Sequence, residues 1–137
     1  MAVLLDPSMV LAAADAADLN HKAAVAWFER ADEPLLLGAL GLADLDLLLQ
    51  RELGVAATQA VVASITAGSI RLVAPTTEDL ARAGELLAEA SEHRPRLADA
   101  VLVATAERLS VRRVAAFDRR PLAVFRPRHV RGFDFEP

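Results

Sequence analysis

The sequence predicts an α/β fold of the three-layer α/β/α type, with a central parallel sheet of four to five strands. Four short strands are expected at residues 2–5, 35–37, 69–74 and 111–117. The apolar runs within them, such as 2–5, 35–37 and 114–117, are continuous rather than alternating, which is typical of strands buried on both faces. Longer segments with helical periodicity separate these runs. Because parallel strands need a crossover connection, usually a helix, this order predicts helices on both faces of the sheet.

Capping signals delimit several of the helices. Pro7 suits the first position of a helix that runs to about Ala14, and Asn20 is a plausible N-cap for the next one. Thr76 and Asp79 have the spacing of a capping box. Further helices are expected at about residues 21–30, 40–53, 57–67, 76–92 and 98–109, and residues 123–125 could form a short fifth strand.

The length and composition indicate one cytoplasmic domain. A chain of 137 residues can bury a single hydrophobic core, so we expect one domain over residues 1–137. It contains no cysteine, which excludes disulfides and thiolate metal sites. The longest uncharged apolar run, residues 35–43, is about half of a membrane span, and the start lacks the features of a signal peptide. We therefore expect no membrane association.

Positive charge is concentrated at the C-terminal end, although the net charge is −4. Residues 1–107 carry 7 basic and 16 acidic side chains, whereas residues 108–137 carry 8 and 3, and all 8 of those basic residues are arginine. The arginine fork suits phosphate and carboxylate contacts. These arginines could therefore contact nucleic acid or form a solvated surface. Residues 125–133 mix basic and aromatic side chains, as single-strand binders do, but they could equally be a tail that packs on the domain or on a partner.

Four aspartates lie where an apolar run ends or where a helix begins. Asp6 follows the first run, Asp118 lies at the end of the last one, Asp99 opens an apolar helical segment, and Asp44 lies one turn into a leucine-rich helix. Ligands of open α/β sheets bind outside the carboxyl ends of the strands. If the fold gathers all four carboxylates there, they need cations to stay ionised, so the pattern predicts a metal site.

Each aspartate alone has an ordinary structural explanation. Asp6 and Asp99 could cap or charge the first turn of a helix, Asp118 could begin a turn, and Asp44 could lie on a helix surface. Their apolar surroundings favour a site, because Asp44 shares a helix face with leucines four residues away on both sides. Asp46 lies about 200° around that helix and is the expected solvent-facing residue of the two.

Four segments, in this order and spacing, resemble PIN-domain ribonucleases, and specifically the VapC-type toxins of bacterial toxin–antitoxin pairs. The resemblance covers essentially the whole chain, and the ordered set carries it rather than any one segment. It implies a PIN-like fold. The segments are Val3-Leu4-Leu5-Asp6-Pro7-Ser8, Leu40-Gly41-Leu42-Ala43-Asp44, Arg96-Leu97-Ala98-Asp99-Ala100 and Arg113-Val114-Ala115-Ala116-Phe117-Asp118-Arg119-Arg120.

Two positions depart from the family pattern. Asp44 stands where the family usually has glutamate, which keeps the charge but shortens the reach of the side chain. Ala116 stands two positions before the last aspartate, where many members carry a hydroxyl residue. The carboxylates are therefore kept, and one supporting hydroxyl is missing.

The resemblance implies an endoribonuclease that uses Mg²⁺ or Mn²⁺, hard cations that take oxygen ligands. Water activated by the metal would hydrolyse the RNA phosphodiester and leave a 5′-phosphate. The implied partners are the RNA substrate and a cognate VapB-type antitoxin that plugs the acidic site. The implied catalytic and metal residues are Asp6, Asp44, Asp99 and Asp118, with Ser8 in support and Arg96, Arg119 and Arg120 as RNA contacts.

Two other functions compete with this interpretation. A catalytically weak PIN-like module would bind RNA or a partner without metal-dependent turnover. A phosphoacceptor signalling domain also uses an acidic pocket at strand ends, but it would have paired acids after the first strand and a lysine late in the chain. This chain has Asp6 alone at that place, and its only lysine is Lys22.

Two further expectations concern the surface. Residues 40–53 and 57–67 carry more leucine, valine and isoleucine than one side of a sheet needs, which favours a homodimer. The three histidines, His21, His93 and His129, show no ligand spacing and are expected at the surface.

Overall fold

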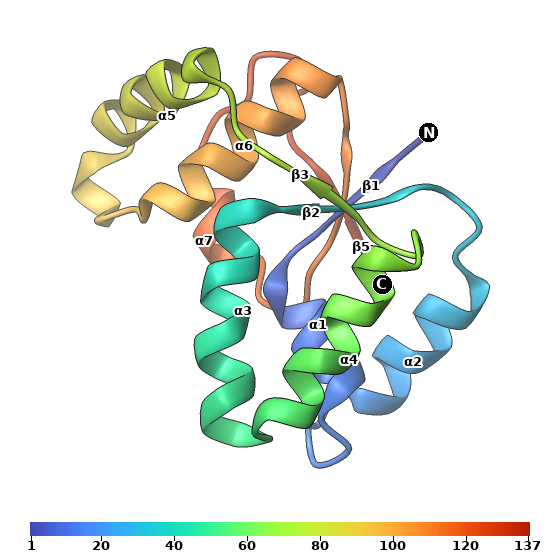
Figure 1. Cartoon of the computed structure of the whole chain (residues 1–137). Coiled ribbons are helices and arrows are strands. Elements are labelled where there is room, and N and C mark those ends of the chain that lie inside the picture. Colours follow the sequence, from blue (N-terminus) through green and yellow to red (C-terminus); the bar gives the residue numbers. More distant parts are fainter.

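The computed structural model describes residues 1–137 and contains one five-stranded sheet in the order β3-β2-β1-β4-β5. Every pair of neighbouring strands is parallel. Helices cover both faces of this sheet (Figure 1), so the predicted three-layer α/β/α fold is confirmed. The strands are β1 (Val3–Leu5), β2 (Leu35–Gly38), β3 (Arg71–Val73), β4 (Arg113–Ala115) and β5 (Asp134–Glu136).

The helices fall close to the expected ranges. A short 3-10 turn at Ser91–His93 ends the fifth helix earlier than expected, and none of the helices is both long and apolar enough to cross a membrane. The helices are α1 (Pro7–Ala14), α2 (His21–Arg30), α3 (Ala39–Glu52), α4 (Val55–Thr66), α5 (Thr77–Glu89), α6 (Leu97–Leu109) and α7 (Arg120–Ala123).

Alternate residues of the central strands point to opposite faces of the sheet and pack into two separate hydrophobic cores. Val3 and Leu5 of β1 pack on one face with side chains from α1 to α4, including Leu45 and Leu49 of α3. Leu4 points to the other face and packs with side chains from α5, α6 and α7. All three β1 side chains are fully buried, which explains why the run is continuously apolar.

The expectation of a strand at residues 123–125 is wrong. Arg120–Ala123 form the short helix α7, which has a proline in its first turn, and Leu122 and Phe125 turn into the core against α6. The fifth strand is β5, and the backbone N–H of Ala116 donates to the Glu136 carbonyl at 2.8 Å. A strand of only three residues is too short to show a detectable periodicity in the sequence.

A cluster of charged side chains anchors β5. Glu136 accepts hydrogen bonds from Arg113 of β4 and from the Trp27 indole N–H of α2, the latter at 2.9 Å. Arg113 also contacts Glu33, just before β2. The Arg113 guanidinium holds the pKa of Glu136 below its usual value. This cluster joins the end of the chain to three other elements.

The arginine-rich tail packs on the domain, which is one of the alternatives left open by the sequence. The Arg128 backbone N–H donates to Glu107 at 2.7 Å, and its guanidinium donates to Glu85 at 3.2 Å. His129 Nε2 lies 2.6 Å from the Val111 carbonyl oxygen. The surface position expected for His129 is therefore wrong, because its ring is half-buried between the tail and the loop before β4.

The start of α2 differs in detail from the expectation. Asn20 is the N-cap residue, but its side chain makes no capping hydrogen bond. Its backbone N–H donates to the Asp18 carboxylate at 2.8 Å instead. His21 is half-buried rather than exposed, because its Nδ1 lies 2.8 Å from the Ala12 carbonyl oxygen.

Asp79 is buried and joins α5 to α6. It forms the predicted capping box with Thr76, in which each residue's backbone N–H donates to the other's side chain, at 3.0 and 3.1 Å. Arg108 of α6 donates to both carboxylate oxygens at 3.0 Å. Burial disfavours the charged form of Asp79, but the hydrogen bonds from Arg108 and Thr76 outweigh it and hold its pKa below the usual value.

We expect Asp79→Ala to lower the free energy of unfolding by roughly 1–3 kcal/mol, because it removes a cap and leaves Arg108 unpaired. Since folding lowers the pKa of Asp79, its contribution is present above the unfolded-state pKa of about 3.9 and is lost as the pH falls through the lower folded-state pKa. Urea unfolding at pH 7 and at acid pH measures this difference. Glu78→Ala, which removes an exposed carboxylate from the same turn, is the matched control, and equal losses in both variants would contradict the prediction.

Candidate active site

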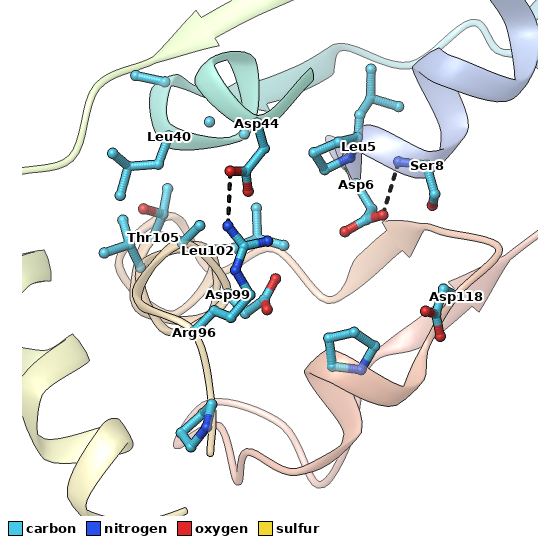
Figure 2. Close-up of a pocket in the computed structure, with 18 of the residues that line it drawn as sticks. Leu5, Asp6, Ser8, Leu40, Asp44, Arg96, Asp99, Leu102, Thr105 and Asp118 are labelled. Atoms are coloured by element: carbon cyan, nitrogen blue, oxygen red, sulfur yellow. Dashed lines mark hydrogen bonds and ion pairs between the residues drawn. The ribbon is translucent and has the colours of Figure 1, made fainter. Parts of the chain in front are cut away.

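A cleft of about 670 Å³ opens at the carboxyl ends of the strands and is bordered by the first turns of α1, α3 and α6. The four predicted aspartates all line it, together with Ser8, Arg96 and Arg120. Figure 2 shows Asp6, Asp44 and Asp99 directed toward one opening, with Asp118 to the side. The fold therefore brings together residues that are as far apart in the chain as Asp6 and Asp118.

Asp6 stands directly after β1 and is the N-cap of α1. One carboxylate oxygen accepts the Ser8 backbone N–H at 3.0 Å, and the other is left to the cleft. The Ser8 hydroxyl accepts the Phe117 backbone N–H at 3.3 Å, which ties the start of α1 to the segment after β4. Burial raises the pKa of Asp6 against the lowering effect of Ser8, and the charges of Asp118 and Asp44 raise it further.

Asp99 lies in the first turn of α6 and faces Asp6 across the cleft. Burial raises the pKa of Asp99, and the neighbouring charge of Asp6 raises it further, while Arg96 acts in the opposite direction. No hydrogen bond from the protein is among the causes of that pKa shift. Asp99 differs in this from Asp6, Asp44 and Asp118, whose carboxylates each accept hydrogen bonds from the protein.

Asp44 comes from α3 and is held by an arginine. The Arg96 guanidinium donates to its carboxylate at 2.9 Å, and the Asp44 side chain is 26% exposed, whereas Arg96 is 64% exposed. The pair is drawn as a dashed line in Figure 2. Asp46 is exposed, so the expected difference between these two aspartates is confirmed. Of the two, only Asp44 lines the cleft.

Asp118 follows β4 and forms a local pair with Arg120. The guanidinium Nε lies 3.1 Å from the Asp118 carboxylate, and this contact lowers the pKa of Asp118. Arg119 lies outside the cleft, where it donates to the Pro137 carbonyl at 2.9 Å and stacks on Phe135. Of the three arginines predicted to contact RNA, Arg96 and Arg120 border the cleft and Arg119 borders a neighbouring hollow.

Gly41, which belongs to one of the four resembling segments, lies in the first turn of α3, where a Cβ would stand 3.4 Å from the Pro7 ring. The first turns of α3 and α1 are therefore close to each other beside the cleft. One further arginine at the site was not predicted from the sequence. Arg94 borders the cleft from the loop before α6, with a left-handed backbone at φ 49°.

The donor set suits a hard divalent cation. The acidic groups of the cleft are all carboxylates, the kind of oxygen donor that Mg²⁺ and Mn²⁺ take. Burial raises the pKa values of Asp6 and Asp99, and the charges of neighbouring aspartates raise them further. No three acidic or histidine side chains are grouped tightly enough to form a complete ligand set, and Arg96 and Arg120 are paired with Asp44 and Asp118. The residues fit such an ion, provided these two arginines yield or water completes the coordination.

We expect Asp99→Asn to raise the unfolding temperature of the metal-free protein at pH 7. Because folding raises the pKa of Asp99, the charged carboxylate opposes folding increasingly as the pH rises above the unfolded value of about 3.9, and a neutral amide removes this penalty. Thermal unfolding with EDTA measures the difference, with exposed Asp46→Asn as the control. A lower unfolding temperature for Asp99→Asn than for the control would contradict the prediction.

Known proteins match nearly the whole chain. A family model described as the PIN domain matches residues 3–126. Ribonuclease VapC26 of Mycobacterium tuberculosis is 28% identical over 125 residues, which cover 91% of this chain and 93% of that protein. The family match and the ribonuclease relative support a nuclease.

Solved structures share the fold. VapC20 of Mycobacterium tuberculosis, described as a Sarcin-Ricin loop cleaving toxin, has a TM-score of 0.82 at 24% identity over 94% of this chain and 98% of that one. VapBC2 from Rickettsia felis, bound to a promoter DNA fragment, gives 0.71 at 9% identity over the full length of both chains. FitAcB from Neisseria gonorrhoeae gives 0.66 at 22% identity over 93% and 99%.

The resemblance on the four aspartate-bearing segments is thus confirmed by the family model over the same part of the chain. The chain belongs to the PIN-domain family, and it resembles the VapC-type members of that family in sequence and in fold.

Proposed function

We propose that this chain is an endoribonuclease that depends on Mg²⁺ or Mn²⁺ and acts as the toxin of a toxin–antitoxin pair. The observation that carries the proposal is the convergence of Asp6, Asp44, Asp99 and Asp118 on one cleft at the strand ends. The ribonuclease relative supports RNA as the substrate. The five parallel strands with one core on each face support residues 1–137 acting as a single domain.

In this proposal the four carboxylates have unequal roles. Asp6 and Asp99 would hold the ion, because their carboxylates lie toward each other in the cleft and neither is paired with an arginine. Asp44 and Asp118, which are paired with Arg96 and Arg120, would support it. Ser8 keeps the Asp6 carboxylate in place. When bound, the ion supplies Lewis acidity, lowers the pKa of the attacking water and stabilises the charge that develops on the phosphate.

Arginines at the cleft are the groups available to hold the RNA. Arg96 and Arg120 are 64% and 91% exposed, and each is paired only with an aspartate of the site. A phosphate oxygen can replace that carboxylate as hydrogen-bond acceptor, so binding of RNA and release of Asp44 or Asp118 are compatible. Arg94 adds positive charge at the same opening, and Arg119 adds it at the neighbouring hollow.

The partners are an RNA substrate, a VapB-type antitoxin and a second copy of the chain. The VapBC and FitAB structures among the matches support the antitoxin. Adjacent helices α3 and α4 (Figure 1) expose large apolar side chains, with Leu47 at 67%, Val55 at 58% and Val62 at 47%. Burying such side chains favours association, which supports a homodimer through these helices.

A phosphoacceptor domain receives no support, because no lysine lines the cleft. A PIN-like module that binds RNA or a partner without cleaving RNA would have the same cleft. Only a direct measurement of RNA cleavage distinguishes it from a nuclease.

We expect the purified chain to cleave RNA with Mg²⁺ or Mn²⁺ and to lose cleavage in EDTA. Asp44→Asn should lower the rate by roughly ten- to hundredfold, the range for residues that support a metal site indirectly. The matched control is Asp46→Asn, which changes an exposed aspartate on the same helix. RNA binding without metal-dependent cleavage would favour the binding module, and equal rates for both variants would remove Asp44 from the site.

We expect the chain to sediment as a dimer at micromolar concentration. Leu47→Asp, which places a charge in the exposed apolar surface of α3, should shift it to a folded monomer, because Leu47 is mostly exposed in the single chain and lies outside its core. Sedimentation velocity measures the outcome. Leu80→Asp alters an exposed leucine on α5, on the other side of the sheet, and should leave the dimer intact. A monomeric wild-type chain would refute this interface.

A further inference from the structure

A second hollow continues the acidic cleft. It has a volume of about 580 Å³ and lies between the turn that joins α1 to α2 and the segment that follows β4. Both hollows share Ser8, Leu11, Asp118 and Arg120. The Asp118–Arg120 pair therefore stands at the junction between the two, and a chain that runs through the cleft can continue into the second hollow.

The walls of this hollow carry three kinds of group. Arg119 and Arg120 are basic, although the Arg119 guanidinium also donates to the Pro137 carbonyl, and Phe117 is apolar. Asp18 and Asn20, from the α1–α2 turn, are the hydrogen-bonding residues of the lining. The volume lies within the roughly 300–1,000 Å³ of sites that hold small ligands. Basic, apolar and hydrogen-bonding surfaces together match the phosphate, the flat base and the base edge of a nucleotide.

The hydrogen bonds within the turn leave specific atoms free. Asp18 Oδ1 accepts the Asn20 backbone N–H at 2.8 Å, and the other oxygen of Asp18 accepts nothing from the protein. The Asn20 amide makes no capping hydrogen bond and is exposed. The hollow therefore offers two polar groups to a ligand. The Asp18 carboxylate can only accept hydrogen bonds, whereas the Asn20 side-chain amide can both donate and accept them.

We propose that the second hollow binds the nucleotide next to the scissile phosphate, and that Asp18 selects a base with an exocyclic amino group. Arg120 contacts the phosphate at the junction, and Asn20 completes the edge that reads the base. A carboxylate accepts a hydrogen bond from an amino group and repels a carbonyl oxygen. Cytosine is therefore favoured over uracil at this position. The inference rests on the proposed nuclease function and assigns the determinant of its specificity.

The test compares RNA oligonucleotides that are identical except for cytosine or uracil at one position flanking a mapped cleavage site, first on one side and then on the other. The wild-type chain with Mn²⁺ should show kcat/KM about tenfold higher for cytosine on one side only, the effect expected of one hydrogen bond to a charged group. Asp18→Asn offers an amide N–H to the uracil carbonyl while keeping an oxygen for the Asn20 N–H. It should level or reverse the preference.

Two further variants make the outcome decisive. Asp32→Asn changes an exposed aspartate outside both hollows and should keep the wild-type preference. Asp18→Ala can neither donate nor accept, so it should level the preference. Equal rates for both bases in the wild type, or an unchanged preference in both Asp18 variants, would overturn this inference and leave the nuclease proposal standing. Cleavage of no RNA at all would overturn the proposed function and this inference with it.

Discussion

Repulsion between carboxylates at the ends of parallel strands is the constraint on which the rest of the site depends. The sheet brings Asp6 and Asp118 to one edge because β1 and β4 are parallel neighbours, and α6 adds Asp99. Burial raises the pKa values of Asp6 and Asp99, and the proximity of the other aspartates raises them further. The buried strands, with β1 fully enclosed, provide the rigidity that holds like charges close together.

The arginines of this chain fall into two groups, which bears on how an acidic protein could bind the RNA proposed as its substrate. Arg108 and Arg113 are tied to buried or half-buried carboxylates and join elements of the fold. Arg96 and Arg120 are mostly exposed and pair with aspartates of the cleft. The excess of positive charge in the last 30 residues is therefore largely structural, and the basic groups near the cleft are few and placed individually.

The sequence was sufficient for the sheet and the helices because burial on both faces leaves continuous apolar runs such as residues 2–5. It was insufficient for β5, whose three residues are fixed by contacts with β4 and by the Arg113 and Trp27 side chains. The aspartates could be predicted from their place at element ends. The pairing of Asp44 with Arg96, 52 residues apart, and the turn of Asp18 toward the second hollow depend on tertiary packing, so no local pattern revealed them.

The ion pair with Arg96 gives Asp44 a structural role, although its side chain is shorter than that of the glutamate usual in the family. Aspartate reaches one methylene less far into the cleft than glutamate, and the long Arg96 side chain spans the remaining space to meet it. The arginine neutralises a carboxylate that would add to the repulsion around Asp6 and Asp99 while no divalent ion is bound. If a divalent ion bound as proposed, it would replace the Arg96 guanidinium as the positive charge beside Asp44, and the guanidinium would become available to a phosphate oxygen. The number of charge contacts would then stay the same, so that neither state of the cleft would leave a half-buried charge unpaired.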